Sequence, residues 1–313
     1  MQWHQPLGLL RRLTVVQAAI LQVALLMLAM PLAAQELAPR AYWPAPRGTN
    51  VMAAGYQFST GDVATDATLP IVGVESRINY LQLTWQRTLG LFGRSANLQI
   101  NVPYTWSTTQ GIVEGQFRRR EVSALADARL QLSINLRGAP SMDAAEFREL
   151  AANPRTIVGA SILVQPPTGG YENDRFINAG TNRWSTKVGL GVIWPFRPRW
   201  MLETHVGAWF FGDNDEFVSA RREQEPIGSV EVHLIRHTQA GFWASLDVNY
   251  YVGGQTEVDG VKRNDELRNS RIGFAMLFPL RRRHAIRAGF STGILTEIGG
   301  DFDSYTLNYL YAW

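Results

Sequence analysis

The nine residues YTLNYLYAW, Tyr305 to Trp313, decide the fold. Large apolar side chains take every second position: Tyr305, Leu307, Tyr309, Tyr311 and Trp313. Successive side chains of a β-strand point to opposite faces, so the stretch predicts a strand with one apolar face. On a soluble sheet this face would be an exposed, adhesive edge. In a membrane it contacts lipid, and the sheet must close with its last strand beside its first, because every backbone polar group needs a partner there.

The N-terminus has the three parts of a secretory signal. Arg11 and Arg12 precede the apolar run LTVVQAAILQVALLMLAM, and PLAA follows, ending at Ala34. This order predicts a signal peptide over residues 1–34 that is cleaved after Ala34, and a retained membrane anchor is the alternative. The remaining chain has no apolar stretch of the roughly 20 residues that a spanning helix needs. The sequence therefore predicts an exported protein.

Twelve segments of the remaining chain alternate between apolar and polar residues. Many are ten residues or longer, and a strand that crosses a bilayer obliquely needs about 9–11 residues. We expect an all-β fold, a transmembrane antiparallel outer-membrane β-barrel of about 12 strands over residues 49–313, preceded by a short N-terminal periplasmic segment, 35–48. The segments are 49–59, 77–89, 95–107, 123–138, 155–166, 183–195, 200–211, 226–236, 240–252, 269–279, 284–295 and 303–313.

The connections alternate between short turns and long loops. Long polar connections such as 60–76 and 167–182 alternate with short ones such as 196–199. This is typical of the outer membrane of a Gram-negative bacterium, where short turns face the periplasm and long loops face outward. One connection that should be short is SMDAAEFRELAANP, Ser141 to Pro154, and it predicts a periplasmic helix capped by Ser141.

Composition narrows the partners. The chain has no cysteine and a net charge of +3, and no basic stripe is interleaved with aromatics, so nucleic acid is not an expected partner. No phosphate-binding loop, zinc-protease motif or EF-hand loop is present, and we expect no cofactor. The expected partners are membrane lipid, lipopolysaccharide, a small-molecule permeant and the barrel assembly machinery, which recognises a terminal strand such as the one ending at Trp313.

If the apolar faces contact lipid, the opposite faces line the lumen. Opposing strands 200–211 and 226–236 would place Glu203 against His233 and His205 against Glu231. This set predicts a ladder of histidines and carboxylates that stiffens the lumen, and a metal site is a weaker alternative. Ser229 lies on the strand of His233, roughly 13 Å away at about 3.3 Å per residue, which disfavours a hydrolytic pair. The candidate lumen residues are Asp127, Arg129, Arg137, Lys187, Glu203, His205, Glu231, His233, Asp247 and Arg287.

Two stretches carry a family resemblance. ELAPRAYWPAPRGTNVMAAGYQFSTGDV, 36–63, and QPPTGGYENDRFINAGTNRWSTKVGLGV, 165–192, resemble the family called "MetA-pathway of phenol degradation", over essentially the whole mature chain. The pieces PTGGY and NAGTNRWS are the most specific. The resemblance implies an outer-membrane barrel associated with the breakdown of aromatic compounds, and it assigns no functional residues.

The long connection at 167–182 is the expected entrance. A loop of this length is uncommon unless it is functional or disordered. We expect it to fold into the barrel mouth, where Tyr171, Phe176 and Trp184 would stack on a flat apolar ligand or, equally, pack the loop or mark the outer membrane interface. Asn182 and Arg183 are expected to anchor the loop to lumen carboxylates.

The function that these patterns favour is a passive outer-membrane uptake channel for small, aromatic or otherwise apolar molecules, without enzymatic activity. Selectivity would come from the constriction and its lining groups. Two alternatives stay open: a non-conducting barrel that binds lipopolysaccharide or a partner, and an outer-membrane lipid hydrolase.

Overall fold

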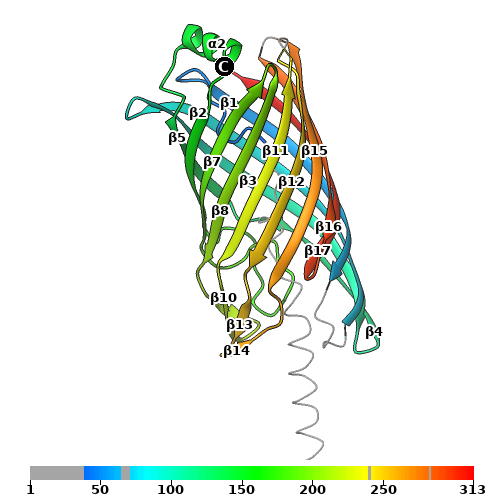
Figure 1. Ribbon diagram of the computed structural model, residues 1–313. Helices are drawn as coiled ribbons and strands as arrows, with labels where there is room; N and C mark the ends of the chain where they lie inside the picture. The colour runs from blue at the N-terminus through cyan, green and yellow to red at the C-terminus, as the bar shows by residue number, and fades with distance from the viewer. Residues whose placement is uncertain (1–38, 65–70, 239–240, 282) are drawn as a thin grey trace, which may run out of the picture.

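The computed structural model describes residues 39–64, 71–238, 241–281 and 283–313. The expected signal peptide lies outside these residues. Over the described chain, twelve strands form one closed antiparallel barrel, and the strands are tilted relative to the barrel axis (Figure 1). They are β1 (Asn50–Ala64), β2 (Ile71–Leu91), β3 (Arg94–Val113), β5 (Arg129–Arg137), β6 (Ile157–Gln165), β7 (Ser185–Arg197), β8 (Trp200–Phe211), β11 (Ile227–His237), β12 (Trp243–Gly253), β15 (Leu267–Arg281), β16 (His284–Leu295) and β17 (Gly299–Ala312). The predicted fold class and strand number are confirmed.

The last strand closes the barrel against the first. β17 pairs with β1 from Val51↔Ala312 to Ala64↔Gly299, and Asn50 and Trp313 exchange two backbone hydrogen bonds of 2.9 Å. The alternating side chains behave as the sequence predicts, because Leu307 is 55% exposed while Asn308 beside it is 5% exposed. The aromatic stripe is therefore an outward face of a closed barrel.

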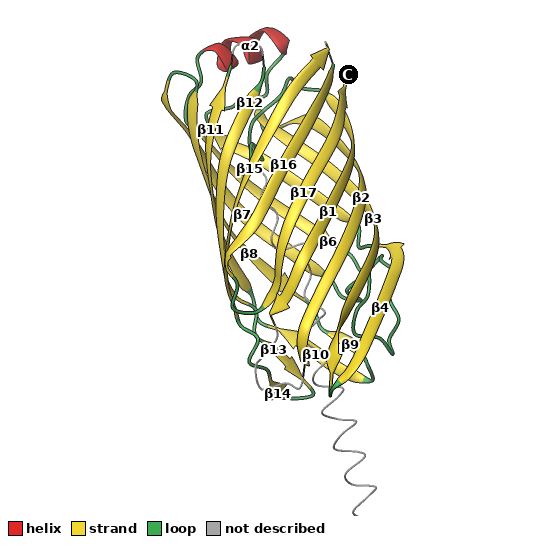
Figure 2. Cartoon of the chain, turned by 90° about the vertical axis from the view of Figure 1, so that its right-hand side faces the viewer, coloured by secondary structure: helices red, strands yellow, loops and turns green. Residues whose placement is uncertain are grey.

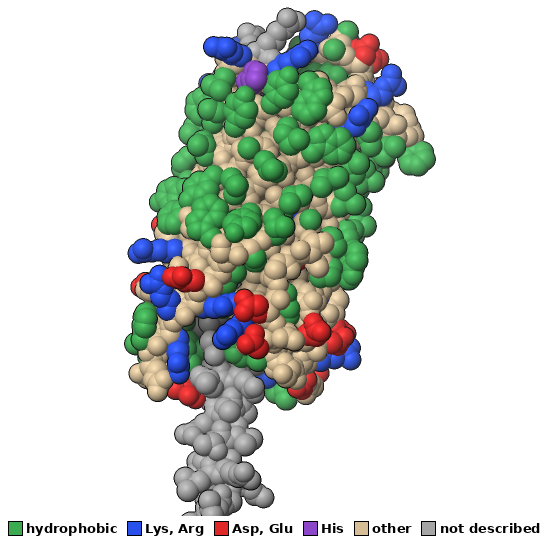
Figure 3. Space-filling view, turned by 180° about the vertical axis from the view of Figure 1, so that it is seen from behind, with side chains coloured by type: hydrophobic (Ala, Val, Ile, Leu, Met, Phe, Trp, Pro, Cys, Tyr) green, Lys and Arg blue, Asp and Glu red, His purple; other side chains and the backbone are tan. Residues whose placement is uncertain are grey.

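Apolar side chains form a band around the outside of the barrel. Figure 3 shows them over the middle of the wall, with Lys, Arg, Asp and Glu gathered towards the two ends. The band includes Leu83, Val102, Leu190 and Leu246, each with about half of its surface exposed. A band of this kind faces the hydrocarbon of the bilayer. No helix among the described residues is long and apolar enough to cross a membrane.

One of the expected strands is divided. β4 (Gln116–Leu125) pairs with the C-terminal half of β3. β5 pairs with the N-terminal half of β3, from Ala96↔Ile134 to Asn101↔Arg129. Residues 126–128 between them are not strand, whereas the sequence predicts one continuous strand over 123–138. The break places Asp127 inside the barrel, where it binds a loop.

The predicted periplasmic helix is present as α2, Ala144–Ala152. Its cap is Asp143, not Ser141 as expected from the sequence. The Asp143 carboxylate accepts hydrogen bonds from the backbone N–H groups of Ala145 and Glu146, at 2.8 and 2.9 Å, and the Glu146 carboxylate accepts one from the Asp143 N–H. This reciprocal arrangement is a capping box. α2 and the C-terminus lie at the same end of the barrel, which is the periplasmic end (Figure 1).

The N-terminal segment is not simply periplasmic, which corrects the expectation for residues 35–48. Its described part, 39–48, enters the lumen from the α2 end, and the Tyr42 side chain is 4% exposed. Tyr42 belongs to a buried apolar cluster with Met142 and Leu150 from the helix region and Ile193 and Ile235 from the wall. Burial of these apolar groups stabilises the inserted segment. The periplasmic end of the lumen is thereby filled.

The outer end carries a second, smaller sheet. β9 (Asn214–Phe217), β10 (Ala220–Gln224), β13 (Thr256–Val258) and β14 (Val261–Lys262) pair in the order β14-β13-β10-β9. Figure 2 shows these short strands beyond the ends of the barrel strands, opposite α2. The sequence predicts long polar loops over 212–225 and 253–268, because strands this short carry almost no alternating pattern. This outer sheet supports the loop over the lumen.

Candidate functional site in the barrel lumen

The loop at 167–182 is held to the lumen wall by one carboxylate. The Oδ1 atom of Asp127 accepts a hydrogen bond from the backbone N–H of Gly169, at 2.8 Å. Its Oδ2 atom accepts from the backbone N–H and the hydroxyl of Thr181, at 2.8 and 2.7 Å. Hydrogen bonds to a charged group are stronger than neutral ones. Asp127 therefore pins both ends of the loop at the same point.

The far side of the loop is attached to the outer sheet. The Asn214 side chain of β9 donates to the Tyr171 hydroxyl at 2.9 Å and accepts from the Asn182 amide at 3.1 Å. Phe176 packs edge-on against Phe217, with ring centroids 6.0 Å apart. The loop is thus fixed between β9 and the wall, and Tyr171 and Phe176 face the lumen cavity described below.

Arg183 differs from its expectation, while Trp184 fits the expected outer interface and not the stacking role. Arg183 is 3% exposed, but it donates to the Gln224 amide and stacks 4.5 Å from the Phe211 ring centroid, so it does not anchor the loop to a lumen carboxylate. Asn182 donates to a carboxylate of the outer sheet, that of Glu216, at 3.2 Å. Trp184 is 59% exposed and shares the outward parity of β7, which places it on the outer surface and not at the lumen.

A cavity of about 280 Å³ lies beneath the loop. Its apolar lining comes from the wall, the loop and the outer sheet. These side chains include Val63, Ile78, Tyr80, Phe176, Ile177, Phe217 and Phe302. The rest of the lining is polar, and a concave site that combines apolar walls with polar groups can bind a small molecule.

The charged lining of this cavity is unbalanced. Two aspartates, Asp127 and Asp247, face it, and Asp127 is engaged by the loop. The arginines outnumber them, and they are Arg129, Arg183, Arg222, Arg271 and Arg287. The Arg271 guanidinium also donates to the Phe302 carbonyl oxygen at 2.5 Å. Carboxylates outside the lining also face some of these arginines, Asp265 near Arg222 and Asp301 near Arg271. Guanidinium groups at the cavity surface can still donate hydrogen bonds to an anionic group on a molecule inside it.

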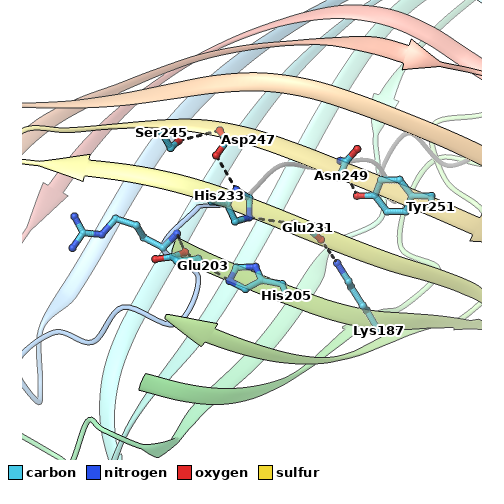
Figure 4. A network of polar contacts seen from close by, with 10 residues as sticks. Lys187, Glu203, His205, Glu231, His233, Ser245, Asp247, Asn249 and Tyr251 are labelled. Atoms are coloured by element: carbon cyan, nitrogen blue, oxygen red, sulfur yellow. Dashed lines mark hydrogen bonds and ion pairs between the residues drawn. The ribbon is translucent and has the colours of Figure 1, made fainter. Parts of the chain in front are cut away.

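A buried polar network lies on the side of the lumen formed by β7, β8, β11 and β12 (Figure 4). The register predicted for β8 and β11 is observed, with Glu203 opposite His233 and His205 opposite Glu231. Lys187 Nζ lies 3.0 Å from Glu231 Oε1. His233 Nδ1 lies 2.8 Å from Asp247 Oδ1. The network joins four neighbouring strands, β7, β8, β11 and β12, and stiffens this side of the barrel.

The inserted N-terminal segment rests on this network. The backbone N–H of Arg40 donates to Glu203 Oε2 at 2.6 Å, and the Tyr42 ring packs edge-on against His205 with centroids 5.0 Å apart. The Tyr42 hydroxyl hydrogen bonds to Ser161 at 2.9 Å. A side chain larger than hydrogen at Gly159 or Gly191 would overlap the Tyr42 ring. These two glycines of β6 and β7 form the recess that accepts Tyr42.

Arg137 does not line the lumen. A register shift between Asn135 and Arg137 pairs Arg137 with Val158, which lies between the buried Ile157 and Gly159 and so points outward. A bulge adds one residue to a strand and moves every later side chain to the other face. The remaining candidates, Arg129, Lys187, Glu203, His205, Glu231, His233, Asp247 and Arg287, have the inward parity of their strands.

Sequence reasoning missed the contribution of Arg40 and Tyr42. Both precede the first strand and belong to no alternating pattern. The available signal was the small side chains on the inward parity of β6 and β7, Gly159, Gly189 and Gly191, since such positions let another part of the chain approach closely.

Ser229, the serine weighed for a hydrolytic pair, has an ordinary structural role. Its hydroxyl donates to the Gly207 carbonyl oxygen at 3.4 Å. His233 is bound instead to Asp247, whose other oxygen accepts from Ser245 at 3.0 Å. The Asp247 carboxylate therefore lies between Ser245 and His233. A hydrolytic pair needs the serine and histidine in direct contact, and in this group they are not.

A closed twelve-stranded barrel with a lipid-facing band and a polar lumen defines an outer-membrane β-barrel protein. The family model for "MetA-pathway of phenol degradation" matches residues 42–297. The chain belongs to this family.

Two solved structures have a similar fold. An outer-membrane channel from Pseudomonas putida F1 superposes with a TM-score of 0.77 at 20% identity, covering 89% of this chain and 100% of that one. The β domain of the Bordetella autotransporter Brka gives 0.50 at 11% identity, covering 85% and 100%. A comparison with curated protein sequences found no match. The protein is therefore an outer-membrane barrel of a Gram-negative bacterium.

Proposed function

We propose that this barrel is a passive channel for small molecules with an aromatic or apolar body, and that it favours those with an acidic group. The observation that carries the proposal is the lumen cavity beneath the loop. Its apolar and aromatic walls suit a flat ring, which can stack on side chains such as Tyr80 and Phe302. Its arginine excess suits a carboxylate or a phenolate.

Two internal restrictions would set the selectivity. The loop pinned by Asp127 covers the cavity from outside, and residues 39–43 occupy the periplasmic end. A permeant enters beside the loop, occupies the cavity and leaves when the N-terminal segment gives way. No step requires an energy source, since diffusion down a gradient carries the solute.

Liposome flux tests this proposal. Purified, refolded protein would be reconstituted, and the entry of a phenolic acid and of a small sugar compared with entry into empty liposomes. We expect the phenolic acid to enter faster than the sugar. Shortening the loop between Gly170 and Gly180, which leaves the Asp127 contacts in place, should reduce this preference.

A specific observation favours a second candidate, a non-conducting barrel. The N-terminal segment, the apolar cluster around Tyr42 and the buried network fill the periplasmic end of the lumen. A structural barrel would contact lipopolysaccharide through exposed outer basic residues such as Arg118 and Arg119 of β4. Folded protein that passes neither solute, and that passes none after residues 35–43 are deleted, would support this candidate over the channel.

The C-terminal strand carries a further part of the proposal. Its outward aromatic stripe is the feature we expect the barrel assembly machinery to bind before β17 pairs with β1. Changing Trp313 to Ser should slow insertion into outer membranes while leaving refolding into detergent unaffected. Insertion at the unchanged rate would contradict this role.

A further inference from the structure

Three side chains of the buried network converge on one point. The ligand-capable atoms of His205, Glu231 and His233 all lie within 4.8 Å of one another. The two imidazole rings have centroids 5.0 Å apart. His205 comes from β8 and the other two from β11, so the group joins adjacent strands by their inward faces (Figure 4).

Both histidines present a nitrogen without a hydrogen-bond partner among the described residues. These are Nε2 of His205 and Nε2 of His233, and both atoms are buried. The His233 side chain is fully buried and that of His205 is 9% exposed. An unpartnered buried polar atom is costly and calls for an explanation, such as an ion bound there.

The groups behind these histidines orient them for a ligand. Asp247 Oδ1 lies 2.8 Å from Nδ1 of His233, and a neutral imidazole that donates from Nδ1 to this carboxylate keeps a lone pair on Nε2 for a metal. Metal-binding histidines commonly have a carboxylate partner in this position. Lys187 holds Glu231 Oε1, and Oε2 of the same carboxylate lies 3.8 Å from His233 Nε2.

From this geometry we propose that His205, His233 and Glu231 form a binding site for a divalent first-row transition-metal ion such as Zn²⁺. Two imidazoles and a carboxylate are a ligand set that Zn²⁺ accepts, with its fourth position open to water or another oxygen. Glu203 Oε2, which also accepts from the Arg40 N–H, lies 3.7 Å from His205 Nε2 and is one protein oxygen near that position. Mg²⁺ and Ca²⁺ prefer all-oxygen sites and do not fit.

The surrounding charge accommodates the ion. Three carboxylates, Glu203, Glu231 and Asp247, lie near two cations, Lys187 and Arg40, while both histidines can bind a metal only when neutral. A divalent ion therefore enters a group with excess negative charge. The ligand atoms are somewhat further apart than the roughly 3.4 Å expected around a tetrahedral Zn²⁺ with bonds of about 2.0–2.1 Å, so binding draws β8 and β11 side chains inward by small rotations.

Such an ion would sit directly beneath the inserted segment. Tyr42 packs on the ring of His205, and the Arg40 backbone binds Glu203, so two contacts of the segment are made to this group. Binding would fix the position of the His205 ring and hence the seat of Tyr42.

The site can be tested with the metal alone. Untagged protein, refolded in detergent and treated with chelator, would be titrated with Zn²⁺ by calorimetry and with Co²⁺ by visible absorption. We expect one ion per chain and the d–d bands of a tetrahedral Co²⁺ site. Asp247→Asn, which removes the partner of His233 Nδ1, should weaken Zn²⁺ binding by about 10–100-fold.

Matched histidine variants localise the ion. His205→Gln and His233→Gln should abolish the Co²⁺ bands, whereas His237→Gln, four residues further along β11, should leave them unchanged. Folding of each variant would be checked by its heat-dependent mobility on a denaturing gel. Folded wild-type protein that binds neither metal would overturn the proposal, as would binding that persists in the His205→Gln/His233→Gln double variant.

Discussion

At the residue scale, single buried polar side chains position whole segments. Asp127 lies in a three-residue break between β4 and β5, is 3% exposed, and binds both ends of the loop that covers the cavity. Glu203 does the same for the N-terminal segment through the Arg40 backbone. In each case the partner is a backbone N–H, which sequence patterns do not display.

The first prediction concerns Asp127. Asp127→Ala removes the acceptor of the Gly169 and Thr181 hydrogen bonds, each worth about 1.5–3 kcal/mol to a charged group. The backbone amides of Gly169 and Thr181 should exchange with deuterium much faster, while strand amides such as that of Val248 stay protected. Asp174→Asn, a loop carboxylate whose side chain is 68% exposed, is the control and should change neither. Equal protection in Asp127→Ala and wild type would show that the loop is held by other contacts.

At the element scale, the N-terminal segment depends on a recess made by glycines from two strands. Gly159 of β6 and Gly191 of β7 lie against the Tyr42 ring. These glycines are far from Tyr42 in the sequence, and the recess exists only once β6 and β7 pair. This is why strand patterns predicted the barrel but placed residues 35–48 outside it.

The second prediction follows from that recess. Gly191→Ala introduces a Cβ that overlaps the Tyr42 ring, so the ring should leave its seat and the periplasmic end should open. Ion conductance of the reconstituted variant should rise several-fold over wild type. Gly228→Ala is the control, because its Cβ would meet no atom closer than 3.5 Å. Conductance that rises equally in both variants would mean that general loosening, and not Tyr42, is responsible.

Strands are the elements that sequence predicted best. Alternation identified all twelve barrel strands, the closure of β17 on β1 and the pairing of Glu203 with His233, because one face of each strand contacts lipid and the other faces the lumen. It failed at Arg137, where a bulge inserts one residue and reverses the faces. It also missed the outer sheet, whose strands of two to five residues are too short to alternate.

The third prediction tests the lipid-facing band. Leu307→Arg places a charge on the outer face of β17, at a side chain that is 55% exposed between apolar neighbours on β1 and β16. A charged residue there costs about 2–4 kcal/mol if it lies near the bilayer midplane. The change in the free energy of unfolding would be measured by denaturant unfolding in vesicles. Phe92→Arg, in a periplasmic turn and 94% exposed, should cost almost nothing. Equal costs for the two substitutions would contradict the assigned membrane band.

At the scale of the whole molecule, the barrel combines an outer cover, a central cavity and an inner seal. The cover is the loop held by Asp127 and β9, the cavity is lined by aromatic, apolar and arginine side chains, and the seal is the N-terminal segment on its polar network. The sequence predicted the wall of this assembly. The cover and seal could not be predicted in detail, since they form from contacts between segments that are distant along the chain.

The central claim, passive passage of small aromatic acids, is tested most directly by the time course of one labelled phenolic acid entering liposomes that contain the folded protein and no energy source. The account predicts uptake faster than into empty liposomes, which ends when the inner concentration equals the outer one. Uptake no faster than into empty liposomes, by protein shown to be folded, would contradict the channel, and accumulation above the outer concentration would contradict its passive nature.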